Sequence, residues 1–450
     1  MRYIDAIDFI MGMTDYERPS TLPRGTRARY DLDRIGAFLG LLEDPHLTAS
    51  TVHIAGTKGK GSTSAMVSSV LKKAGYTPGL FTSPHLHTFR ERIQVDNHPV
   101  PEQEFADLVE ELSPIAERVA ASGQGRVTVF ELILAMAFHC FRNRKVGAQV
   151  IEVGLGGRLD ATNLVEPTAC GITALGLDHT EILGNTIEEI AYEKGGIIKP
   201  HIPVVCAPQQ PGALSVIKEI CEQRHSKFIL AGEDINWSVE SYSIDGQVLD
   251  IKTANNKYHL DIPLLGTYQR ENAAVAIGII EILVENGLSI GEKDIYEGFK
   301  EVEWPCRLEV LQEDPVILAD GAHNPHSAAK LADAITELFP NKNIALILGV
   351  SGNKDLRGLI GELAPLAPVS VVATRSRHPM ATDPDRIAEE FAAFTNKVHK
   401  TDSVEDALEL SLKMSEPDTL ILTTGSLFVA AEIREVIKGI KPEIYPAITR

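Results

Sequence analysis

The chain has few cysteines and no long apolar run. Only 5 of its 450 residues are cysteines, and no two stand in a C-x-x-C spacing, so neither a disulfide framework nor a zinc-site signature is present. No run approaches the roughly 20 apolar residues that span a bilayer. The first ten residues, MRYIDAIDFI, carry two aspartates where a secretion signal would have an unbroken apolar stretch. We therefore expect a protein of the reducing cytoplasm.

Positive charge is also scarce. The 43 Lys and Arg residues against 62 Asp and Glu residues give a net charge of −19. This balance argues against a sequence-independent nucleic-acid binder, which must neutralise phosphates. If the ligands are anions, local lysines, backbone amides or metal ions must hold them, because the overall field repels them.

What is present is the composition of a globular protein, with 44% hydrophobic and 23% charged residues. A length of 450 residues exceeds one ordinary core and predicts two domains. Apolar runs typical of buried strands alternate with helical patterns, which predicts a mostly parallel sheet with helices on both faces. The predicted strands are 51–56, 148–154, 169–176 and 202–207, and the predicted helices are 62–74, 128–143 and 186–199.

The alternation stops at residues 227–265, which are rich in β-branched residues and turn signals and predict an antiparallel β extension. Helical patterns return at 268–287 and 291–300, and 301–310 is the best linker candidate. Strand-like runs at 316–321, 343–350, 369–376 and 419–426 then predict a smaller Rossmann-like α/β domain. We therefore predict an N-terminal domain over 1–304 and a C-terminal domain over 305–450.

The run IAGTKGKGSTSAM, residues 54–66, departs from the phosphate-loop pattern G-x-x-x-x-G-K-[ST]. Gly61 follows Lys60 where Ser or Thr is usual, and Ile54 stands in place of the first glycine. The run nevertheless lies between a predicted strand and a predicted helix, where backbone amides and a helix N-terminus attract phosphate. Lys60 and Ser62 would then contact phosphate or its metal ion. The alternative is a glycine-rich turn without a ligand.

Candidate metal ligands follow two further predicted strands. Glu152 in IEVGLGGRLDATN and His179 in GLDHTEILG stand where open α/β sheets present ligand-binding groups. A carboxylate beside a triphosphate loop suits Mg²⁺. The alternatives are a solvated glutamate in a turn and a packed histidine, and these remain open on the residues alone.

Other strand ends carry polar residues too. FTSPHL places Ser83 and His85 on a loop, and ADGAHNPHS places Asp320 and His323 between a strand and a helix. An aspartate there binds a ribose hydroxyl or caps the next helix. Arg307 would bring a cation to the phosphates only if the two domains close. By itself, Lys194 is best interpreted as a surface lysine paired with a nearby glutamate.

Together these motifs resemble the folylpolyglutamate synthase/dihydrofolate synthase family of the ATP-dependent Mur ligase superfamily. The resemblance runs from about residue 27 to the end of the chain. It rests on eight motifs that occur in the family's order: GTKGKGS, FTSPHL, EVGLGGRLDATN, LDHTEILG, IAYEKGGIIK, GTYQRENAAVA, CRLE and DGAHNPHS. The run TTGSLFVAAEI follows them near the C-terminus. It implies an amide ligase that joins L-glutamate to a folate carboxylate through an acyl phosphate, and it leaves open whether tetrahydrofolate, dihydropteroate or both are the acceptors.

The resemblance also implies roles for single residues. The catalytic groups would be Lys60, Glu152, His179, Lys194 and Arg307. The ATP contacts would be Gly56, Thr57, Lys58, Gly59, Lys60, Gly61, Ser62, Asn272, Arg307, Asp320 and His323. Two Mg²⁺ ions would be held by Ser83, Glu152, His179 and Lys194, the lysine being carbamylated. The substrate contacts would be Tyr30, Asp31, Thr128, Phe130, Glu131, Leu159, Asp160, Ala161 and Ser426.

Three positions depart from the family pattern, although none removes a catalytic group. Lys58 stands where many relatives have asparagine, Gly195 where alanine is frequent, and Cys306 where glycine is usual. The partners would be small molecules only, with a monomer as the family default. Two rival hypotheses are a peptidoglycan-precursor ligase, disfavoured because only about 50 residues precede the loop, and a non-catalytic ATP-binding regulatory module.

Overall fold

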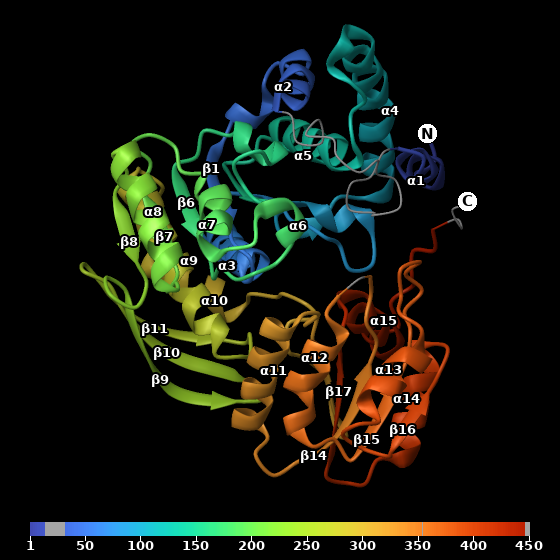
Figure 1. Cartoon of the computed structure of the whole chain (residues 1–450). Coiled ribbons are helices and arrows are strands. Elements are labelled where there is room, and N and C mark those ends of the chain that lie inside the picture. Colours follow the sequence, from blue (N-terminus) through green and yellow to red (C-terminus); the bar gives the residue numbers. More distant parts are fainter. Residues whose placement is uncertain (14–31, 353, 446–450) are drawn as a thin grey trace.

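The computed structural model of the chain describes residues 1–13, 32–352 and 354–445, and it contains two α/β domains (Figure 1). The predicted substrate contacts Tyr30 and Asp31 lie outside these residues. In Figure 1 the N-terminal domain is blue to yellow and the C-terminal domain is orange to red. The exact boundary between residues 304 and 305 stays a prediction.

The N-terminal domain is built on an eight-stranded sheet with the order β4-β3-β2-β5-β1-β6-β7-β8. All neighbours pair in parallel except β3 and β4, which add an antiparallel edge. The strands are β1 (Ser50–Ala55), β2 (Gly79–Phe81), β3 (Ile93–Val95), β4 (His98–Pro99), β5 (Ala148–Glu152), β6 (Ala169–Ile172), β7 (Val204–Cys206) and β8 (Phe228–Leu230).

Helices cover both faces of this sheet because successive strand residues point to opposite sides. Val150 packs into one apolar cluster and its neighbour Ile151 into another. The helices on the Val150 side are α3 (Lys60–Lys73), α9 (Tyr268–Glu285) and α10 (Glu292–Lys300). Those on the other side are α1 (Tyr3–Met11), α2 (Leu32–Leu41), α4 (Glu102–Val119), α5 (Val129–Arg144), α7 (Ile187–Gly195) and α8 (Pro211–Arg224), with the single turn α6 (Thr180–Leu183) before α7.

A separate three-stranded antiparallel sheet follows, with the order β11-β10-β9. Its strands are β9 (Asn236–Ser243), β10 (Gly246–Lys252) and β11 (Lys257–Ile262). The predicted β extension is therefore present, but its first part was wrong. Residues 228–230 pair with β7 as a parallel edge strand of the main sheet, because three residues carry too little pattern to distinguish the two arrangements.

The C-terminal domain contains a six-stranded sheet with the order β12-β13-β17-β14-β15-β16. Its strands are β12 (Glu309–Glu313), β13 (Val316–Ala319), β14 (Asn343–Leu348), β15 (Ser370–Ala373), β16 (Val398–Lys400) and β17 (Thr419–Thr424). One face is covered by α11 (Pro325–Leu338), α12 (Leu356–Leu363) and α13 (Pro384–Phe391), and the other by α14 (Val404–Met414) and α15 (Leu427–Lys438). The predicted fold class is thus confirmed. None of the helices in the described part of the chain has the length and apolar character needed to cross a membrane.

Candidate active site

Four adjacent strand ends bring the predicted site residues to one edge of the N-terminal sheet. Strands β2, β5, β1 and β6 are consecutive neighbours and run parallel. Ser83 follows β2, Glu152 ends β5, the glycine-rich loop follows β1, and His179 lies beyond β6. Because parallel strands end at the same edge, residues spread over more than 120 positions of the sequence become neighbours.

The loop after β1 has the backbone of a phosphate site. The amides of Thr57 and Lys58 both donate to the Ala174 carbonyl, which fixes the start of the loop. Gly59 then adopts a φ of 91° and a Cβ there would lie 2.2 Å from the Asn272 amide oxygen, so only glycine fits. Gly59 is also the N-cap of α3 and has no side chain to cap it. The first-turn amides of α3 are therefore available to an anion.

The departure at Gly61 has a steric reason. A Cβ on Gly61 would lie 2.6 Å from Cζ2 of Trp304, a residue of the segment that leads to the C-terminal domain. A serine or threonine at this position, as in the standard pattern, would collide with the indole ring. The hydroxyl is supplied one residue later by Ser62, which is buried and lies 3.4 Å from the Gln269 side-chain amide.

Glu152 lies beside the loop lysine. Its Oε1 is 3.7 Å from the Lys60 ammonium, and its Oε2 accepts a hydrogen bond of 3.2 Å from the Ser83 amide. Burial raises the pKa of the Glu152 carboxyl, while the charges of Lys60 and Arg307 oppose that rise. Arg307 comes from the C-terminal side of the linker, so cations from both domains act on one buried carboxylate. A buried carboxylate with lone pairs to spare fits a hard cation such as Mg²⁺.

Lys194 is buried rather than exposed, which corrects the surface interpretation based on residues alone. It is 5% exposed, and no hydrogen bond or ion pair joins its amine to another described residue. Burial and then the Lys60 charge lower the pKa of Lys194 to about 7. Its charge also acts on His179, whose pKa is lowered mainly by burial. An unpaired buried lysine with a neutral amine is the form that reacts with CO₂.

The C-terminal domain places Asp320 next to the linker. Its two oxygens accept hydrogen bonds of 2.8 Å from the amides of Leu308 and Ala322. The alternative role as a cap of the following helix is wrong, because Asn324 caps α11 instead. Asp320 therefore holds the backbone just after the linker at Leu308. Burial raises the pKa of its carboxyl, and the charge of Arg307 opposes that rise.

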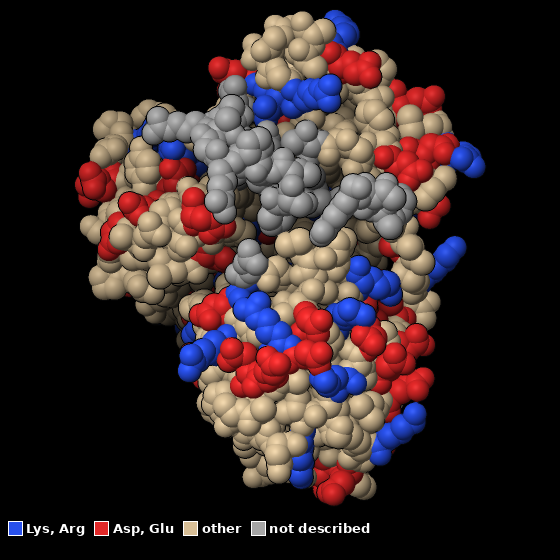
Figure 2. Space-filling model, turned by 45° about the vertical axis from the view of Figure 1, so that its right-hand side comes forward, with Lys and Arg blue, Asp and Glu red and all other residues tan. Residues whose placement is uncertain are grey.

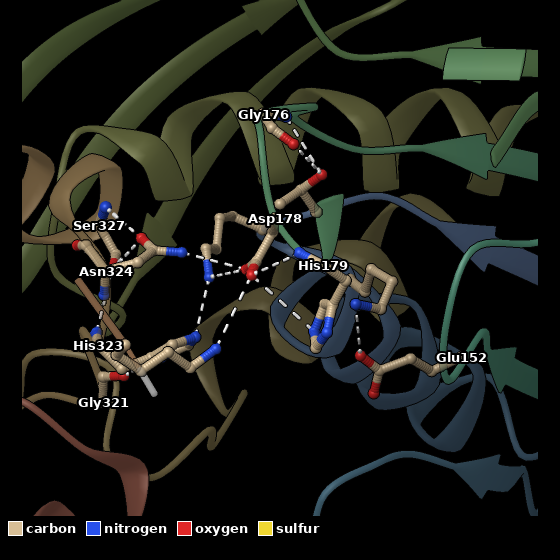
Figure 3. Close-up of polar contacts among 12 residues, drawn as sticks. Glu152, Gly176, Asp178, His179, Gly321, His323, Asn324 and Ser327 are labelled. Atoms are coloured by element: carbon tan, nitrogen blue, oxygen red, sulfur yellow. Dashed lines mark hydrogen bonds and ion pairs between the residues drawn. The ribbon is translucent and has the colours of Figure 1, made fainter. Parts of the chain in front are cut away.

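His323 reaches the phosphate loop of the other domain (Figure 3). Its Nδ1 is 2.8 Å from the Gly321 carbonyl, so Nδ1 carries the proton and Nε2 is the acceptor for the Lys58 ammonium 3.2 Å away. Burial lowers the pKa of His323 to about 3, in agreement with a neutral ring. This contact makes His323 and Lys58 neighbours although 265 positions separate them.

The predicted substrate residues divide into two groups. Thr128 and Glu131 cap the start of α5 reciprocally, and Glu131 also pairs with the buried Arg34, which donates from Nε to Oε2 over 2.9 Å and places Nη2 2.8 Å from Oε1. Asp160 is likewise saturated by local contacts, accepting from the amides of Leu155 and Thr162. The polar atoms of Thr128, Glu131 and Asp160 are therefore engaged in contacts that hold the local backbone in place.

Of the remaining predicted substrate residues, Phe130, Leu159 and Ala161 keep exposed surface, whereas Ser426 is buried. Phe130 packs edge-on against Phe81 and lies over Gly154, where a Cβ would be 2.6 Å from its ring. Leu159 is exposed and Ala161 is half-buried. Ser426 is more distant in the sequence and caps α15, with its hydroxyl 3.0 Å from that of Ser351.

Sequence reasoning did not assign roles to Asp178, Asn324, Lys354 and Trp304, which the structure places around this site. Asp178 and Asn324 lie inside recognised motifs and were detectable there. Lys354 lies in a loop without any motif, so no sequence signal identifies it. On the face shown in Figure 2, acidic and basic side chains are interspersed. At the site, by contrast, basic side chains gather from both domains: Lys58, Lys60, Lys194, Arg307 and Lys354.

Comparisons with known proteins agree with this architecture. The family model described as Mur ligase middle domain matches residues 54–280, and the model described as Mur ligase, glutamate ligase domain matches residues 306–427. The dihydrofolate synthase/folylpolyglutamate synthase of Bacillus subtilis (strain 168) is 37% identical over 412 residues, covering 90% of this chain and 95% of that protein. The folylpolyglutamate synthase of Lacticaseibacillus casei is 33% identical, covering 91% of this chain and 95% of that protein.

A solved structure shows the same likeness in three dimensions. The Mycobacterium tuberculosis folylpolyglutamate synthase complexed with ADP and AMPPCP superposes with a TM-score of 0.85 at 30% identity, covering 92% of this chain and 96% of that one. Two Mur ligase domains in sequence, relatives matched over nearly their full length and the same fold lead to one conclusion. The chain belongs to the folylpolyglutamate synthase/dihydrofolate synthase family of Mur ligases.

Proposed function

We propose that this chain is an ATP-dependent ligase that joins L-glutamate to the carboxylate of a folate and releases ADP and phosphate. The observation that carries the proposal is that the buried carboxylate of Glu152 lies 3.7 Å from the Lys60 ammonium and also feels the charge of Arg307, so cations of two domains act on it. A nucleotide site assembled from both domains suits a reaction that must exclude water. The names of the relatives support tetrahydrofolate and dihydropteroate as the acceptors to be tested.

The reaction follows from the chemistry of a carboxylate and ATP. A folate carboxylate oxygen attacks the γ-phosphorus, the bond from that phosphorus to the β,γ-bridging oxygen breaks, and ADP leaves. The amine of L-glutamate then attacks the acyl carbon, loses a proton, and phosphate departs with the electron pair of the acyl C–O bond. Phosphoryl transfer needs positioning and charge neutralisation, which Lys60, Arg307 and the α3 amides supply.

Ser83 and Glu152 would hold one Mg²⁺, and His179 with a carbamylated Lys194 would hold a second. The residues fit, because the Glu152 carboxylate is buried beside the loop and the Lys194 amine has no partner among the described residues. Magnesium, when bound, neutralises phosphate charge and orients the attacking oxygen. His179 offers a softer nitrogen ligand, so the second site depends on the carbamate for its oxygen.

The nucleotide would lie between the two domains. Residues Gly56 to Ser62 would hold its phosphates, Asn272 would contact the adenine, and Asp320 with His323 would contact it from the C-terminal side. The exposed Leu159 and half-buried Phe130 and Ala161 would line the pterin side, while Ser426 would contact substrate from α15. The polar residues Thr128, Glu131 and Asp160 would support that wall. The five buried free cysteines support a cytoplasmic enzyme, and we expect a monomer.

The test is ADP release by the purified chain with ATP and Mg²⁺. We expect release that depends on both L-glutamate and either tetrahydrofolate or dihydropteroate, with a product heavier by one glutamate residue in mass spectrometry. Release that ignores every folate would instead support a regulatory ATP-binding module. Release with a muramyl-peptide precursor alone would support a peptidoglycan ligase, which the relatives do not favour.

Glu152→Gln is the matched inactive variant, because it keeps the shape of the side chain and removes its charge. We expect glutamate-dependent turnover to fall by roughly 10²–10³-fold, as for other losses of transition-state electrostatics. Glu193→Gln makes the same change at a residue that pairs with Arg158 near the surface, and it should leave turnover within a factor of about two. Near-normal turnover in Glu152→Gln would overturn the role of this carboxylate.

A further inference from the structure

One carboxylate at the junction of the two domains has no part in the reaction described above. Asp178 lies between β6 and α6, and its side chain is 14% exposed. Figure 3 shows it at the centre of contacts that arrive from both domains. It belongs to the same strand-end loop as His179, whose amide donates to its Oδ1 over 3.1 Å.

The partners of Asp178 come from three separate segments. The Lys58 ammonium of the phosphate loop lies 3.1 Å from Oδ2, and the Asn324 side-chain amide donates to the same oxygen over 3.1 Å. The Lys354 ammonium lies 3.8 Å from Oδ1. Lys58 belongs to the N-terminal domain, while Asn324 and Lys354 belong to the C-terminal domain. One carboxylate therefore bridges the two domains directly.

The electrostatics make this bridge necessary for the observed arrangement. Two partly buried ammonium groups that approach each other repel unless a negative charge lies between them. The Asp178 carboxylate lies between them, with Oδ2 3.1 Å from the Lys58 ammonium and Oδ1 3.8 Å from the Lys354 ammonium. It therefore acts as the shared counter-charge of the two lysines.

The contact continues to His323. Lys58 donates both to Asp178 and to Nε2 of His323, whose other nitrogen is fixed by the Gly321 carbonyl. Gly321 in turn donates its amide to the Cys306 carbonyl, next to Arg307. Through Lys58, Asn324 and Lys354, the position of Asp178 is therefore linked to the segment that presents Arg307.

We propose that Asp178 is a positioning residue that holds the C-terminal domain in register with the phosphate loop, so that Arg307 faces the site. The inference rests on the proposed function for its kinetic consequence, whereas its structural consequence is independent of any folate. The backbone at the start of the phosphate loop is held by the Ala174 carbonyl and not by this carboxylate, which contacts only the Lys58 side chain there. Nucleotide affinity and domain closure should therefore respond differently to its removal.

The first measurement is domain closure in full-length Asp178→Asn, which keeps the shape and removes the charge. Fluorescent dyes placed by Glu219→Cys on α8 and Lys413→Cys on α14 report the separation of the domains, since both sites are exposed and the five native cysteines are buried. With AMPPCP and Mg²⁺, the closed population should fall by roughly 10-fold or more relative to the unsubstituted chain. A closed population equal to that of the unsubstituted chain would overturn the proposal.

Measuring nucleotide binding distinguishes a loss of domain positioning from damage to the phosphate loop in Asp178→Asn. The Kd for AMPPCP, measured by titration calorimetry, should change by less than about threefold in Asp178→Asn. The KM for L-glutamate should rise and kcat should fall, roughly 10–100-fold in their ratio. A large loss of AMPPCP affinity with unchanged closure would show that Asp178 serves the loop alone and would overturn the proposal.

Glu181→Gln is the matched control. It removes one negative charge three positions further along, and the side chain is exposed and makes no hydrogen bond or ion pair with other described residues. Closure and kinetics should remain within about twofold of the unsubstituted chain. An effect as large as that of Asp178→Asn would show that net charge, and not the bridge, is responsible.

Lys354→Met tests the contact between Asp178 and Lys354 from the C-terminal domain. This variant leaves the residues before α6 unchanged, so misfolding of that loop does not explain its effect. If the bridge acts as proposed, the effects of Asp178→Asn and Lys354→Met on closure are non-additive in a double-mutant cycle. Strict additivity would overturn the proposal. If the unsubstituted chain releases no glutamate-dependent ADP, the proposed function fails, while the closure measurements still decide the role of Asp178.

Discussion

Gly61 illustrates how a single residue distinguishes this phosphate loop from the standard one. Its missing side chain leaves room for the Trp304 ring, whose Cζ2 would lie 2.6 Å from a Cβ. The indole belongs to the segment that joins the two domains, so the loop and the linker are in direct contact. The variant motif is therefore an adaptation to a neighbour in space.

Restoring the standard motif should harm this protein. We expect Gly61→Ser to lower stability by about 1–3 kcal/mol, the usual cost of overpacking, and to lower the midpoint of the first calorimetric transition. Trp304→Leu in the same chain should recover part of this loss, because it removes the ring. Gly361→Ala, on α12 with no atom within 4 Å of the added Cβ, should be neutral or stabilising. Equal midpoints for Gly61→Ser and the unsubstituted chain would contradict the contact.

Lys194 makes a second prediction at the scale of one residue. A pKa of about 7 leaves roughly half of the amine neutral at neutral pH, against about 0.1% or less for an ordinary lysine. The neutral nitrogen attacks CO₂, a C=O electron pair moves to oxygen, and a proton is released to give a carbamate. With ¹³C-bicarbonate, we expect one carbamate signal in NMR that grows as pH rises through about 7.

The controls for this signal are two other lysine variants. Lys194→Ala should lose the signal. Lys199→Met should keep it, because the Lys199 amine already donates to the Asn163 carbonyl over 2.7 Å. A carbamate signal that persists in Lys194→Ala would place the modification elsewhere.

At the scale of one element, α15 carries two glutamates whose pKa values are shifted in opposite directions. Burial raises the pKa of Glu432 to about 7, and the charge of Glu435 adds to the rise. Burial acts in the same way on Glu435, but hydrogen bonds from His87 and Arg377 outweigh it and lower its pKa. One turn of helix therefore holds a carboxyl that prefers to be neutral and another that prefers to be ionised.

The two residues should give opposite pH dependences. Unfolding lets Glu432 titrate near 4.3, so its contribution favours the folded state below that pH and is lost as pH rises to about 7. Glu432→Gln should therefore stabilise the protein at pH 8, by at most about 4 kcal/mol, and have little effect at pH 4. Thermal midpoints between pH 4 and 8 measure this.

Glu435→Gln is the control with the opposite sign. Its lowered pKa contributes stability above the ordinary glutamate pKa, and that stability is lost as pH falls through the folded value. The variant should therefore be destabilised at pH 8 and approach the unsubstituted chain at low pH. The same pH dependence in both variants would contradict these assignments.

At the scale of the whole molecule, contacts join the domains on either side of the site. On one side, His87 of the N-terminal domain contacts Glu435 and Arg434 of α15 at 3.0 and 3.2 Å. The Tyr445 hydroxyl returns to His85 over 3.0 Å, and Figure 1 shows this end of the chain beside the N-terminal domain. On the other side, Arg270 pairs with Glu337 at 3.1 Å. The domains are thus coupled at positions distant in sequence.

Removing one side of this coupling should separate the unfolding of the two domains. For the double variant His87→Ala, Tyr445→Ala we expect the first calorimetric transition to fall by about 2–4 °C per kcal/mol lost and the second to change little. The double variant His399→Ala, Tyr192→Ala changes exposed residues within single domains and should leave the separation unchanged. A wider separation in that control than in the first variant would contradict interdomain coupling.

The class of fold, the order of most strands and helices and the family can all be predicted from the residues alone. Strand and helix periods are local, so a run such as 148–154 predicts β5 without knowledge of its neighbours. Motifs such as GTKGKGS and DGAHNPHS likewise predict the loop, Lys60 and His323 as site residues from short stretches. The strand 228–230 was wrongly predicted as antiparallel, because three residues do not indicate which strand they pair with or in which direction.

The contacts that these residues make become known only from the folded chain. The burial of Lys194, the Trp304 ring over Gly61 and the bridge from Asp178 to Lys354 all depend on segments far apart in the chain. Desolvation and Coulomb interactions act over a few ångströms in space, whatever the separation in sequence. For that reason the motifs predict the type of reaction, whereas the shifted pKa values and the interdomain contacts can be described only for the folded chain.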